Sequence, residues 1–319
     1  MRFVVLGAGA LGSIIAGHLA RAGEDVMVVA RGDRARYLRQ HGITITGLAD
    51  FTIACPVITD PKELRAADVL IVAVKTYDMA AALAPLRHLD VATVLSVQNG
   101  VLKNEQLAHA FGTEATVGAA AFFSGEALLE GLVRFTFNQC LYVGELPEGT
   151  SERVQQLATA FARAGIKAQA TVHIQTIEWS KFAAWVGAMV LSVLTRLETY
   201  KFFSDSDAAL VGTRLMRETA ALAAKQGIAL EDTPPFLVKT ISSVTEPEAL
   251  EKVRQLGTMM QARAPTHRMS SLQDLERGRR LEVEETLGYA VAKAATAGLA
   301  VPTIDTCYRL ISGINRFLR

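Results

Sequence analysis

Near its start the chain reads Phe3-Val4-Val5-Leu6-Gly7-Ala8-Gly9-Ala10-Leu11-Gly12. The apolar run predicts a buried strand, and the small, helically spaced residues 13–20 that follow predict a helix. Glycines at this turn let the backbone approach a pyrophosphate, and the helix N-terminus offers free N–H groups and a positive dipole end. Residues 7–12 therefore predict a dinucleotide-binding loop; a glycine-rich turn that binds nothing is the alternative.

The bulk composition indicates a chain that can bury sizeable cores. With 319 residues, half of them apolar and a fifth charged, the chain is long enough for two domains. Its net charge of +1 gives no electrostatic argument for binding nucleic acid or an acidic membrane surface. We therefore expect neither as a partner.

The cysteines indicate a reducing compartment, and we expect the cytoplasm. Cys55, Cys140 and Cys307 are too scattered for a disulfide framework or a metal cluster. A glycine motif at residue 7 leaves no room for a signal peptide before it. The most membrane-like stretch, 182–194, is shorter than the ~20 residues of a membrane span, so we interpret it as a buried helix.

Strand and helix signals alternate in the first half of the chain. Near-continuous apolar runs separated by helices predict a parallel sheet covered on both faces. After these runs, we expect an antiparallel hairpin turning at Asn138-Gln139, an amphipathic helix at 151–164 and a short strand at 167–172. The expected parallel strands are 3–6, 25–30, 67–74, 93–97 and 116–121.

From Ile174 onward, helical patterns replace strand patterns. The expected helices are 174–197, 208–226, 247–262, 281–297 and 303–317. The predicted fold is an α/β Rossmann-like domain with a mostly parallel, doubly wound sheet (1–173), followed by an all-α domain (174–319). Apolar residues of the first long helix are expected to form a core or a homodimer interface.

The end of the second strand predicts which dinucleotide is bound. NAD enzymes usually place an acidic residue there for the ribose hydroxyls, whereas this chain has Ala30-Arg31-Gly32. An arginine suits a 2′-phosphate, so Arg31 predicts NADP(H). In the alternative, Arg31 is a loop charge and Asp33 serves the ribose; Arg34 and Arg36 are further candidates for a phosphate pocket.

Two more strand ends carry candidate site residues. Lys75 and Asn99-Gly100 each follow an expected strand, and ligands of open α/β sheets bind beyond such carboxyl ends. Either segment could instead be ordinary turn chemistry. Reduction of a carbonyl also needs a proton donor, and composition alone does not choose one.

The motifs together resemble the ketopantoate reductase (2-dehydropantoate 2-reductase) family, over nearly the whole chain and in order. The resemblance rests on residues 7–12, Ala30-Arg31, Val72-Ala73-Val74-Lys75, Gln98-Asn99-Gly100, Glu178-Trp179-Ser180-Lys181-Phe182, Ser270-Ser271-Leu272-Gln273-Asp274, Arg279-Arg280-Leu281-Glu282-Val283-Glu284 and Gly298-Leu299-Ala300-Val301-Pro302-Thr303. It implies a Rossmann domain, a helical domain, a substrate cleft between them and a place in pantothenate biosynthesis.

The resemblance also implies a catalytic pair. Lys181 would donate a proton to the keto oxygen of a 2-oxo acid, and Glu282 would lie near the lysine and the cofactor ribose, setting the position and charge of the lysine. Without the resemblance, Lys181 would be read as a helix-surface charge and Glu282 as part of a solvated face. A lysine near a carboxylate and a developing alkoxide can donate a proton near neutral pH.

The remaining implied roles concern binding. Asn99 would contact the nicotinamide or the substrate, and Ser270 the substrate carboxylate or a nearby hydroxyl. Lys75 and Arg31 would hold the adenosine half of NADPH.

One departure from the family pattern concerns the substrate. Trp185 and Met189 share a helix face with Lys181, at positions where pantoate-forming enzymes typically have asparagines. Large apolar residues there predict a more hydrophobic 2-oxo acid than ketopantoate, unless they simply pack into the core. Alternatives to this reductase are an opine- or hydroxyisobutyrate-type dehydrogenase and an NADPH-binding sensor without turnover.

Overall fold

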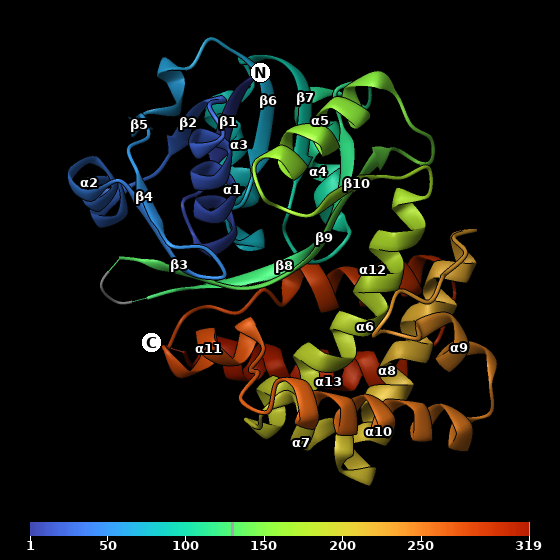
Figure 1. Ribbon diagram of the computed structural model, residues 1–319. Helices are drawn as coiled ribbons and strands as arrows, with labels where there is room; N and C mark the ends of the chain where they lie inside the picture. The colour runs from blue at the N-terminus through green and yellow to red at the C-terminus, as the bar shows by residue number, and fades with distance from the viewer. Residues whose placement is uncertain (129–130, 319) are drawn as a thin grey trace. The chain divides into compact units, whose positions relative to one another are not determined.

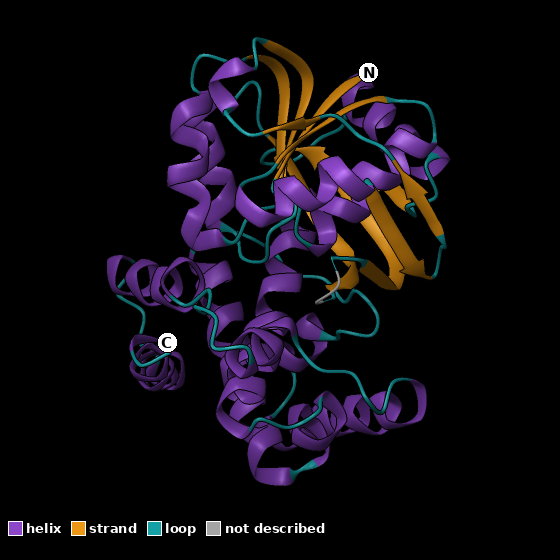
Figure 2. Ribbon diagram, turned by 90° about the vertical axis from the view of Figure 1, so that its left-hand side faces the viewer, coloured by secondary structure: helices purple, strands orange, loops and turns teal. Residues whose placement is uncertain are grey.

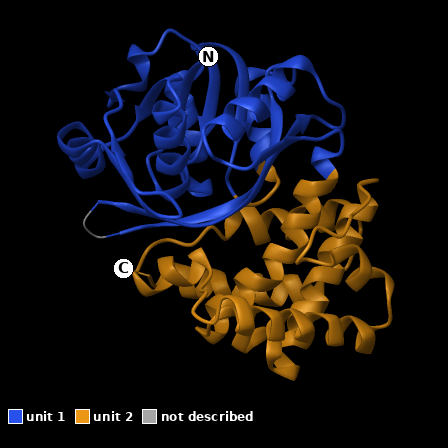
Figure 3. Ribbon diagram, viewed as in Figure 1, with its two compact units in different colours: residues 1–98, 103–175 blue, residues 99–102, 176–319 orange. Residues whose placement is uncertain are grey.

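The computed structural model describes residues 1–128 and 131–318. The chain forms two compact units (Figure 3): residues 1–98 with 103–175, and residues 99–102 with 176–319. The division lies close to the expected domain boundary after residue 173, which stays a prediction. The sequence did not indicate that the short segment 99–102 would cluster with the helical unit.

A parallel sheet of order β5-β2-β1-β6-β7 organises the first unit (Figure 1). Val5 of β1 pairs with Val28 on one side and Ile71 on the other. This confirms the predicted parallel sheet, since every strand pair within it is parallel. Its strands are β1 (Arg2–Leu6), β2 (Asp25–Val29), β5 (Val57–Ile58), β6 (Ala66–Val72) and β7 (Asp90–Ser96).

Alternate residues of β1 enter two different cores, because side chains on a strand alternate between faces. Phe3 and Val5 pack in a cluster with residues of α1 and α5, whereas Val4 and Leu6 pack with residues of α3 and α4. Helices thus cover both faces, which explains the unbroken apolar run. These helices are α1 (Ala10–Arg21), α3 (Met79–Leu83), α4 (Leu102–Phe111) and α5 (Glu152–Arg163), and α2 (Gly32–His41) follows β2.

A second sheet corrects two expectations. Thr116 forms a parallel bridge with Val94 of β7, but the rest of the stretch 116–121 opens β8 (Val117–Ala127), which pairs antiparallel with β9 (Val133–Glu145). The expected hairpin at Asn138-Gln139 is wrong, because β9 runs through these residues. The other strands of this sheet, in the order β10-β9-β3-β4, are β3 (Ile43–Gly47), β4 (Phe51–Ile53) and β10 (Ala168–Ala170).

The polar pair Asn138-Gln139 marks a bulge rather than a turn. Phe122 pairs with Cys140 and Phe123 with Asn138, so Gln139 is the extra residue of β9. The side chain of Asn138 donates to the Gly165 carbonyl and accepts from the Lys167 amide. A turn-forming residue type is here used to fasten the strand to the chain beside it.

The second unit is helical, as expected, and the named strands of the described residues all belong to the first unit. Figure 2 shows helices and strands in different colours. The helix expected at 281–297 begins later than predicted: it starts as a π-helical turn, η4 (Glu284–Gly288), which leads directly into α12 (Tyr289–Thr296). The other helices are α6 (Ile174–Thr195), α7 (Thr199–Ser204), α8 (Ser206–Lys225), α9 (Val238–Ser243), α10 (Glu246–Arg263), α11 (Ser270–Glu276) and α13 (Pro302–Arg316).

Helix α6 is apolar on all sides because it lies between two cores. Phe182 and Val186 pack in one cluster, and Ala183 and Leu191 pack in the other. By length and composition it is the one helix of the described residues that could cross a membrane, yet 83% of its most apolar window is buried. This burial matches the expected core helix.

Candidate functional site

The glycines of the first turn have distinct steric roles. Gly7 has φ +103°, and a Cβ on Gly12 would lie 1.9 Å from the Gly7 carbonyl oxygen, so both positions require glycine. A Cβ on Gly9 would meet no protein atom within 4 Å. Gly9 is also the N-cap of α1, where no side chain caps the helix. The helix N-terminus therefore faces open space, as phosphate binding needs.

Arg34 fastens this glycine loop. Its Nε donates to the Ala8 carbonyl at 2.9 Å, its Nη2 to Ser13 Oγ at 2.9 Å and its Nη1 to the Gly131 carbonyl at 2.5 Å. The sequence left Arg34 as a candidate phosphate ligand, but the structure uses its guanidinium to shape the loop. Arg36 likewise pairs with Asp33.

Arg31 remains exposed just beyond β2. It is the N-cap residue of α2 and has extended backbone angles. Its position after Val29 and Ala30 is the strand end at which the sequence expected a 2′-phosphate contact. The alternative ribose ligand, Asp33, is engaged by Arg36.

The loops after β6 and β7 are joined by buried polar side chains. Gln98 donates from Nε2 to the Val74 carbonyl at 2.8 Å, directly before Lys75, which is half-buried. Ser96 Oγ donates to Gln98 Oε1 at 3.0 Å. Lys103, which is 4% exposed, donates to the carbonyls of Ser96, Gln98 and Ala119.

Within the helical unit, Lys181 and Asn99 are hydrogen-bonded. Nζ of Lys181 donates to Oδ1 of Asn99 at 3.1 Å, and the lysine is half-buried on α6. The neighbouring Ser180 is buried, and its Oγ accepts from the Glu231 amide at 2.9 Å, which ties the chain after α8 to this turn of α6. Two residues predicted separately are thus brought together.

The segment that contains Glu282 reaches the same loop through Gly100. A Cβ built on Gly100, which has φ +83°, would lie 3.3 Å from Cγ2 of Thr286. Thr286 is buried and donates to the carbonyls of Glu282 and Val283 at the start of η4. Glu282 itself is half-buried. π-Helical turns of this kind are frequent at functional sites.

Ser270 lies on α11, which contacts α6 at a different position from Lys181. It is the exposed first residue of α11, and its neighbour Ser271 hydrogen-bonds Ser192 at 3.0 Å. Ser192 lies about 16 Å of helix axis beyond Lys181. The Ser271–Ser192 hydrogen bond therefore holds α11 at a part of α6 that is distant from Lys181.

Trp185 and Met189 are mostly inside the helical core. They are 9% and 2% exposed, and they pack in the same cluster as Val101 and Leu272. This burial supports the alternative that both residues pack into the core, and it does so more strongly for Met189 than for Trp185.

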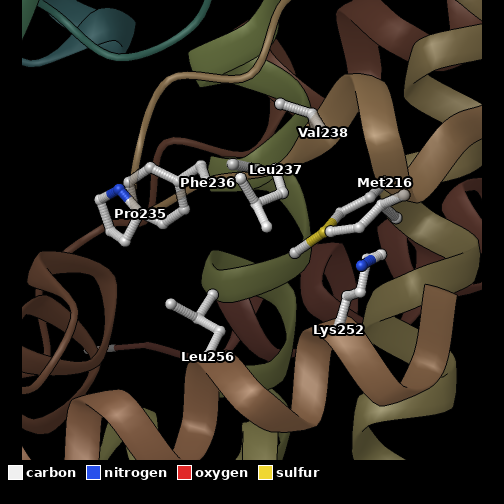
Figure 4. Close-up of a pocket in the computed structure, with 9 residues that line it drawn as sticks. Met216, Pro235, Phe236, Leu237, Val238, Lys252 and Leu256 are labelled. Atoms are coloured by element: carbon white, nitrogen blue, oxygen red, sulfur yellow. The ribbon is translucent and has the colours of Figure 1, made fainter. Parts of the chain in front are cut away.

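Neither hollow described on the surface contains a predicted site residue. The cavity in Figure 4 measures about 10 Å³, enough for one water molecule, and is walled by apolar side chains such as Met216 and Phe236. The other hollow, of about 230 Å³, lies between α3 and α4 and is lined by residues such as Ala80, Arg87 and His109.

Sequence reasoning missed the buried polar residues behind the site. Lys103 and Leu107 are one helical turn apart and are both buried on α4. A lysine in the apolar position of an amphipathic helix was the available signal. Arg34 was predicted only as a candidate for a phosphate pocket, and nothing in the sequence indicated its hydrogen bond to the Ala8 carbonyl.

A parallel sheet with a glycine-rich first turn, followed by a helical unit that holds a lysine against a strand-end amide, defines a dinucleotide-dependent oxidoreductase. The chain belongs to the ketopantoate reductase family. Residues 3–148 match the "Ketopantoate reductase PanE/ApbA" domain, and residues 173–315 match its C-terminal domain. These matches confirm the expected family and fold, and they indicate oxidoreduction at a CH–OH group like that of 2-dehydropantoate 2-reductase.

Individual relatives extend over the full length. The 2-dehydropantoate 2-reductase of Pyrococcus abyssi is 29% identical over 98% of this chain and 97% of its own. The crystal structure of 2-dehydropantoate 2-reductase from Geobacter metallireducens has a TM-score of 0.84, 24% identity, and coverage of 98% and 99%. D-Mandelate dehydrogenase with NADH and anilino(oxo)acetate shares the fold, with a TM-score of 0.85, 18% identity, and coverage of 100% and 99%.

Proposed function

We propose that the chain reduces a 2-oxo acid to the 2-hydroxy acid with NADPH, in the manner of 2-dehydropantoate 2-reductase. The observation that carries the proposal is the hydrogen bond from Lys181 to Asn99. It joins the proposed proton donor on α6 to the side-chain amide that follows β7, and ligands of open α/β folds bind beyond the carboxyl ends of such strands. The free thiols Cys55, Cys140 and Cys307 agree with a reducing compartment, and we propose the cytoplasm.

The glycine loop fits the diphosphate of the dinucleotide. Open space at Gly9 and the uncapped N-terminus of α1 leave room for an anion against backbone N–H groups. When bound, the reduced nicotinamide supplies the hydride. Arg31 favours NADPH over NADH because a guanidinium can bind a 2′-phosphate with two parallel hydrogen bonds. Lys75 would add a cation for the adenosine half.

Lys181 would supply the proton. The carbonyl oxygen of a 2-oxo acid becomes an alkoxide as its carbon is reduced, and an ammonium N–H within hydrogen-bond reach neutralises that charge. The amide oxygen of Asn99 orients the lysine, which leaves the Nδ2 donors of Asn99 to face the nicotinamide or the substrate. Glu282 would set the position and charge of Lys181, and Ser270 would bind the substrate carboxylate or hydroxyl.

The substrate side chain is the second part of the proposal. Trp185 follows Lys181 by one helical turn and is the less buried of the two apolar residues on that face. An indole there disfavours a substrate hydroxyl, since a site recognises a polar group only by pairing it. We therefore propose a 2-oxo acid with a larger apolar side chain than ketopantoate.

The direct test is NADPH oxidation, followed at 340 nm, across a panel of 2-oxo acids that includes ketopantoate. The expected result is turnover, with kcat/KM highest for a branched or aromatic apolar side chain. Efficient turnover of ketopantoate well above that of all apolar acids would retain the reductase and remove the substrate proposal. Tight NADPH binding with no oxidation by any acid would instead favour the sensor.

A further inference from the structure

We propose that Lys103 is a positioning residue, which holds the peptide that leads into Asn99 and so fixes the geometry of the Lys181–Asn99 pair. The inference rests on the proposed function, because it assigns Lys103 a part in the same reaction. No motif of the sequence pointed to this residue. It follows from the buried hydrogen bonds at the end of β7.

Lys103 has an unusual environment for a lysine. It is 4% exposed, and lysine is almost never fully buried without partners. Its Nζ donates to the carbonyl oxygens of Ser96 at 3.0 Å, Gln98 at 3.2 Å and Ala119 at 2.5 Å. Removing a charge from water costs several kcal/mol unless such bonds replace its hydration. A buried lysine at this position therefore needs these carbonyls to stay in place.

The bonded carbonyls lie at the point where β7 ends. Ser96 is the last residue of β7, and Gln98 directly precedes Asn99. The carbonyl of Gln98 and the backbone N–H of Asn99 belong to one planar peptide unit. A hydrogen bond to the Gln98 carbonyl oxygen therefore also fixes the backbone nitrogen of Asn99. On its other side Asn99 is followed by Gly100 with φ +83°, a conformation that few other residues adopt. The backbone of Asn99 is thus defined on both sides.

Gln98 and Ser96 extend the same arrangement. Ser96 Oγ donates to Gln98 Oε1 at 3.0 Å and accepts from the Gln98 amide at 3.2 Å. Gln98 Nε2 donates to the Val74 carbonyl at 2.8 Å, next to Lys75. Ser96 and Gln98 are 0% and 6% exposed, so no water is needed to hold this turn. Lys103, on α4, adds its hydrogen bonds to the carbonyls of Ser96 and Gln98.

We infer that these restraints on the backbone fix the direction in which the side-chain amide of Asn99 points. A misplacement of about 1 Å at a catalytic group can cost ~100-fold in rate. The hydrogen bonds of Lys103 to the Ser96, Gln98 and Ala119 carbonyls restrain the backbone that leads into Asn99. The proposed effect of Lys103 on the reaction therefore passes through Asn99, as is expected of a positioning residue.

A double-mutant cycle tests that path. Lys103→Met, which keeps the length of the side chain but removes its donors, is expected to lower kcat by ~10- to 100-fold with a small change in NADPH affinity. In an Asn99→Ala background the same substitution is expected to lower kcat less than ~3-fold, because the group that it positions is gone. The control is Lys62→Met, the same change at an exposed lysine, which should leave kcat unchanged.

The outcomes separate the inference from the proposed function. If Lys103→Met lowers kcat by the same factor in the wild-type and Asn99→Ala backgrounds, Lys103 does not act through Asn99. That result would overturn the role of Lys103 and leave the proposed reductase activity unaffected. If none of the 2-oxo acids in the panel supports NADPH oxidation by the wild-type protein, the proposed function is wrong, and the inference fails with it. If Lys103→Met does not fold, Lys103→Arg replaces it, since a planar guanidinium cannot reproduce the ammonium donors that reach three separate carbonyls.

Hydrogen exchange gives a readout that does not depend on turnover. In Lys103→Met the amides of residues 97–101 are expected to exchange at least ~10-fold faster than in the wild type, while those of β1 and α6 keep their rates. Unchanged exchange at 97–101 in a folded Lys103→Met protein would contradict the proposed restraint. Faster exchange throughout the protein would mean general destabilisation and would also count against it.

Discussion

Lys181 donates a hydrogen bond of 3.1 Å to the side-chain oxygen of Asn99, a residue 82 positions earlier in the chain. The lysine comes from the second turn of a buried helix, and the asparagine comes from the turn that follows a parallel strand. An amide oxygen is a neutral acceptor, so this bond orients the ammonium without neutralising it. In the proposed mechanism this bond orients the proton donor, and each partner can be tested separately.

Asn99→Ala removes the acceptor and is expected to lower kcat by ~10- to 100-fold, because Lys181 loses its orientation. NADPH affinity should fall less, since Arg31 and the glycine loop lie elsewhere in the sequence. Stopped-flow reduction of the preferred 2-oxo acid, together with NADPH fluorescence titration, measures both quantities. Unchanged kcat in a folded Asn99→Ala enzyme would exclude a catalytic role for the pair.

The glycine loop allows a matched pair of substitutions. Gly12→Ala places a Cβ 1.9 Å from the Gly7 carbonyl oxygen, so we expect lower thermal stability as well as lost NADPH binding. Gly9→Ala meets no protein atom within 4 Å. It should keep the wild-type Tm but weaken NADPH binding by ~10-fold or more, because its methyl group takes the space of the pyrophosphate. Wild-type NADPH affinity in Gly9→Ala would argue against this loop as the phosphate site.

Arg31 is predicted to choose between the two nicotinamide cofactors. Arg31→Ala should weaken NADPH binding by ~10- to 100-fold and leave NADH binding nearly unchanged, because only NADPH carries the 2′-phosphate. Isothermal titration with both cofactors measures the ratio. The matched control is Arg39→Ala on the same helix, where the guanidinium already contacts the Val57 carbonyl and Thr59. An equal loss for NADH and NADPH at Arg31 would contradict the assignment.

Glu145 gives a pH-dependent prediction about stability. Two hydrogen bonds from Arg153, with a smaller contribution from Ser151, hold the pKa of the Glu145 carboxyl below its ordinary value against the opposing effect of burial. A lowered folded-state pKa means that the stabilisation is present above the unfolded pKa and is lost as pH falls through the folded pKa.

Glu145→Gln is therefore expected to lower the free energy of unfolding by about 1 kcal/mol at pH 7, with the difference shrinking below pH ~4. Urea unfolding at both pH values measures it. Glu246→Gln removes an exposed pair with Arg214 and should change stability little at either pH. A constant difference for Glu145→Gln across the pH range would contradict an ionic origin.

The sequence predicted the architecture well where one physical signal dominated. The continuous apolar run of β1 indicated a strand buried on both faces, and Phe3 and Val4 indeed enter different cores. The hairpin at Asn138-Gln139 failed because a polar pair in a strand signals a turn and a bulge equally well. The π-helical turn η4, in which Thr286 is buried, is a feature that local helix propensity does not report.

The candidate site was likewise predicted only in part from the sequence. Motif spacing pointed to Lys181 and Asn99, and their hydrogen bond required the fold to bring two distant segments together. Lys103 and Arg34 donate to backbone carbonyls. Almost any sequence supplies carbonyls, so these contacts cannot be predicted from it, and the lysine at an apolar helix position was an indirect signal for Lys103 alone. Trp185 and Met189 were noticed as departures, but only burial separates a pocket wall from a core residue.

The most direct test of the central claim compares Lys181→Met with the wild type, at saturating NADPH and the best 2-oxo acid of the panel. The account predicts turnover by the wild type and a loss of ~100- to 10,000-fold in kcat for Lys181→Met, with NADPH affinity retained. Lys225→Met, the same change at an exposed lysine of α8, should keep full activity. A Lys181→Met enzyme that reduces the acid at the wild-type rate would contradict the assignment of the proton donor.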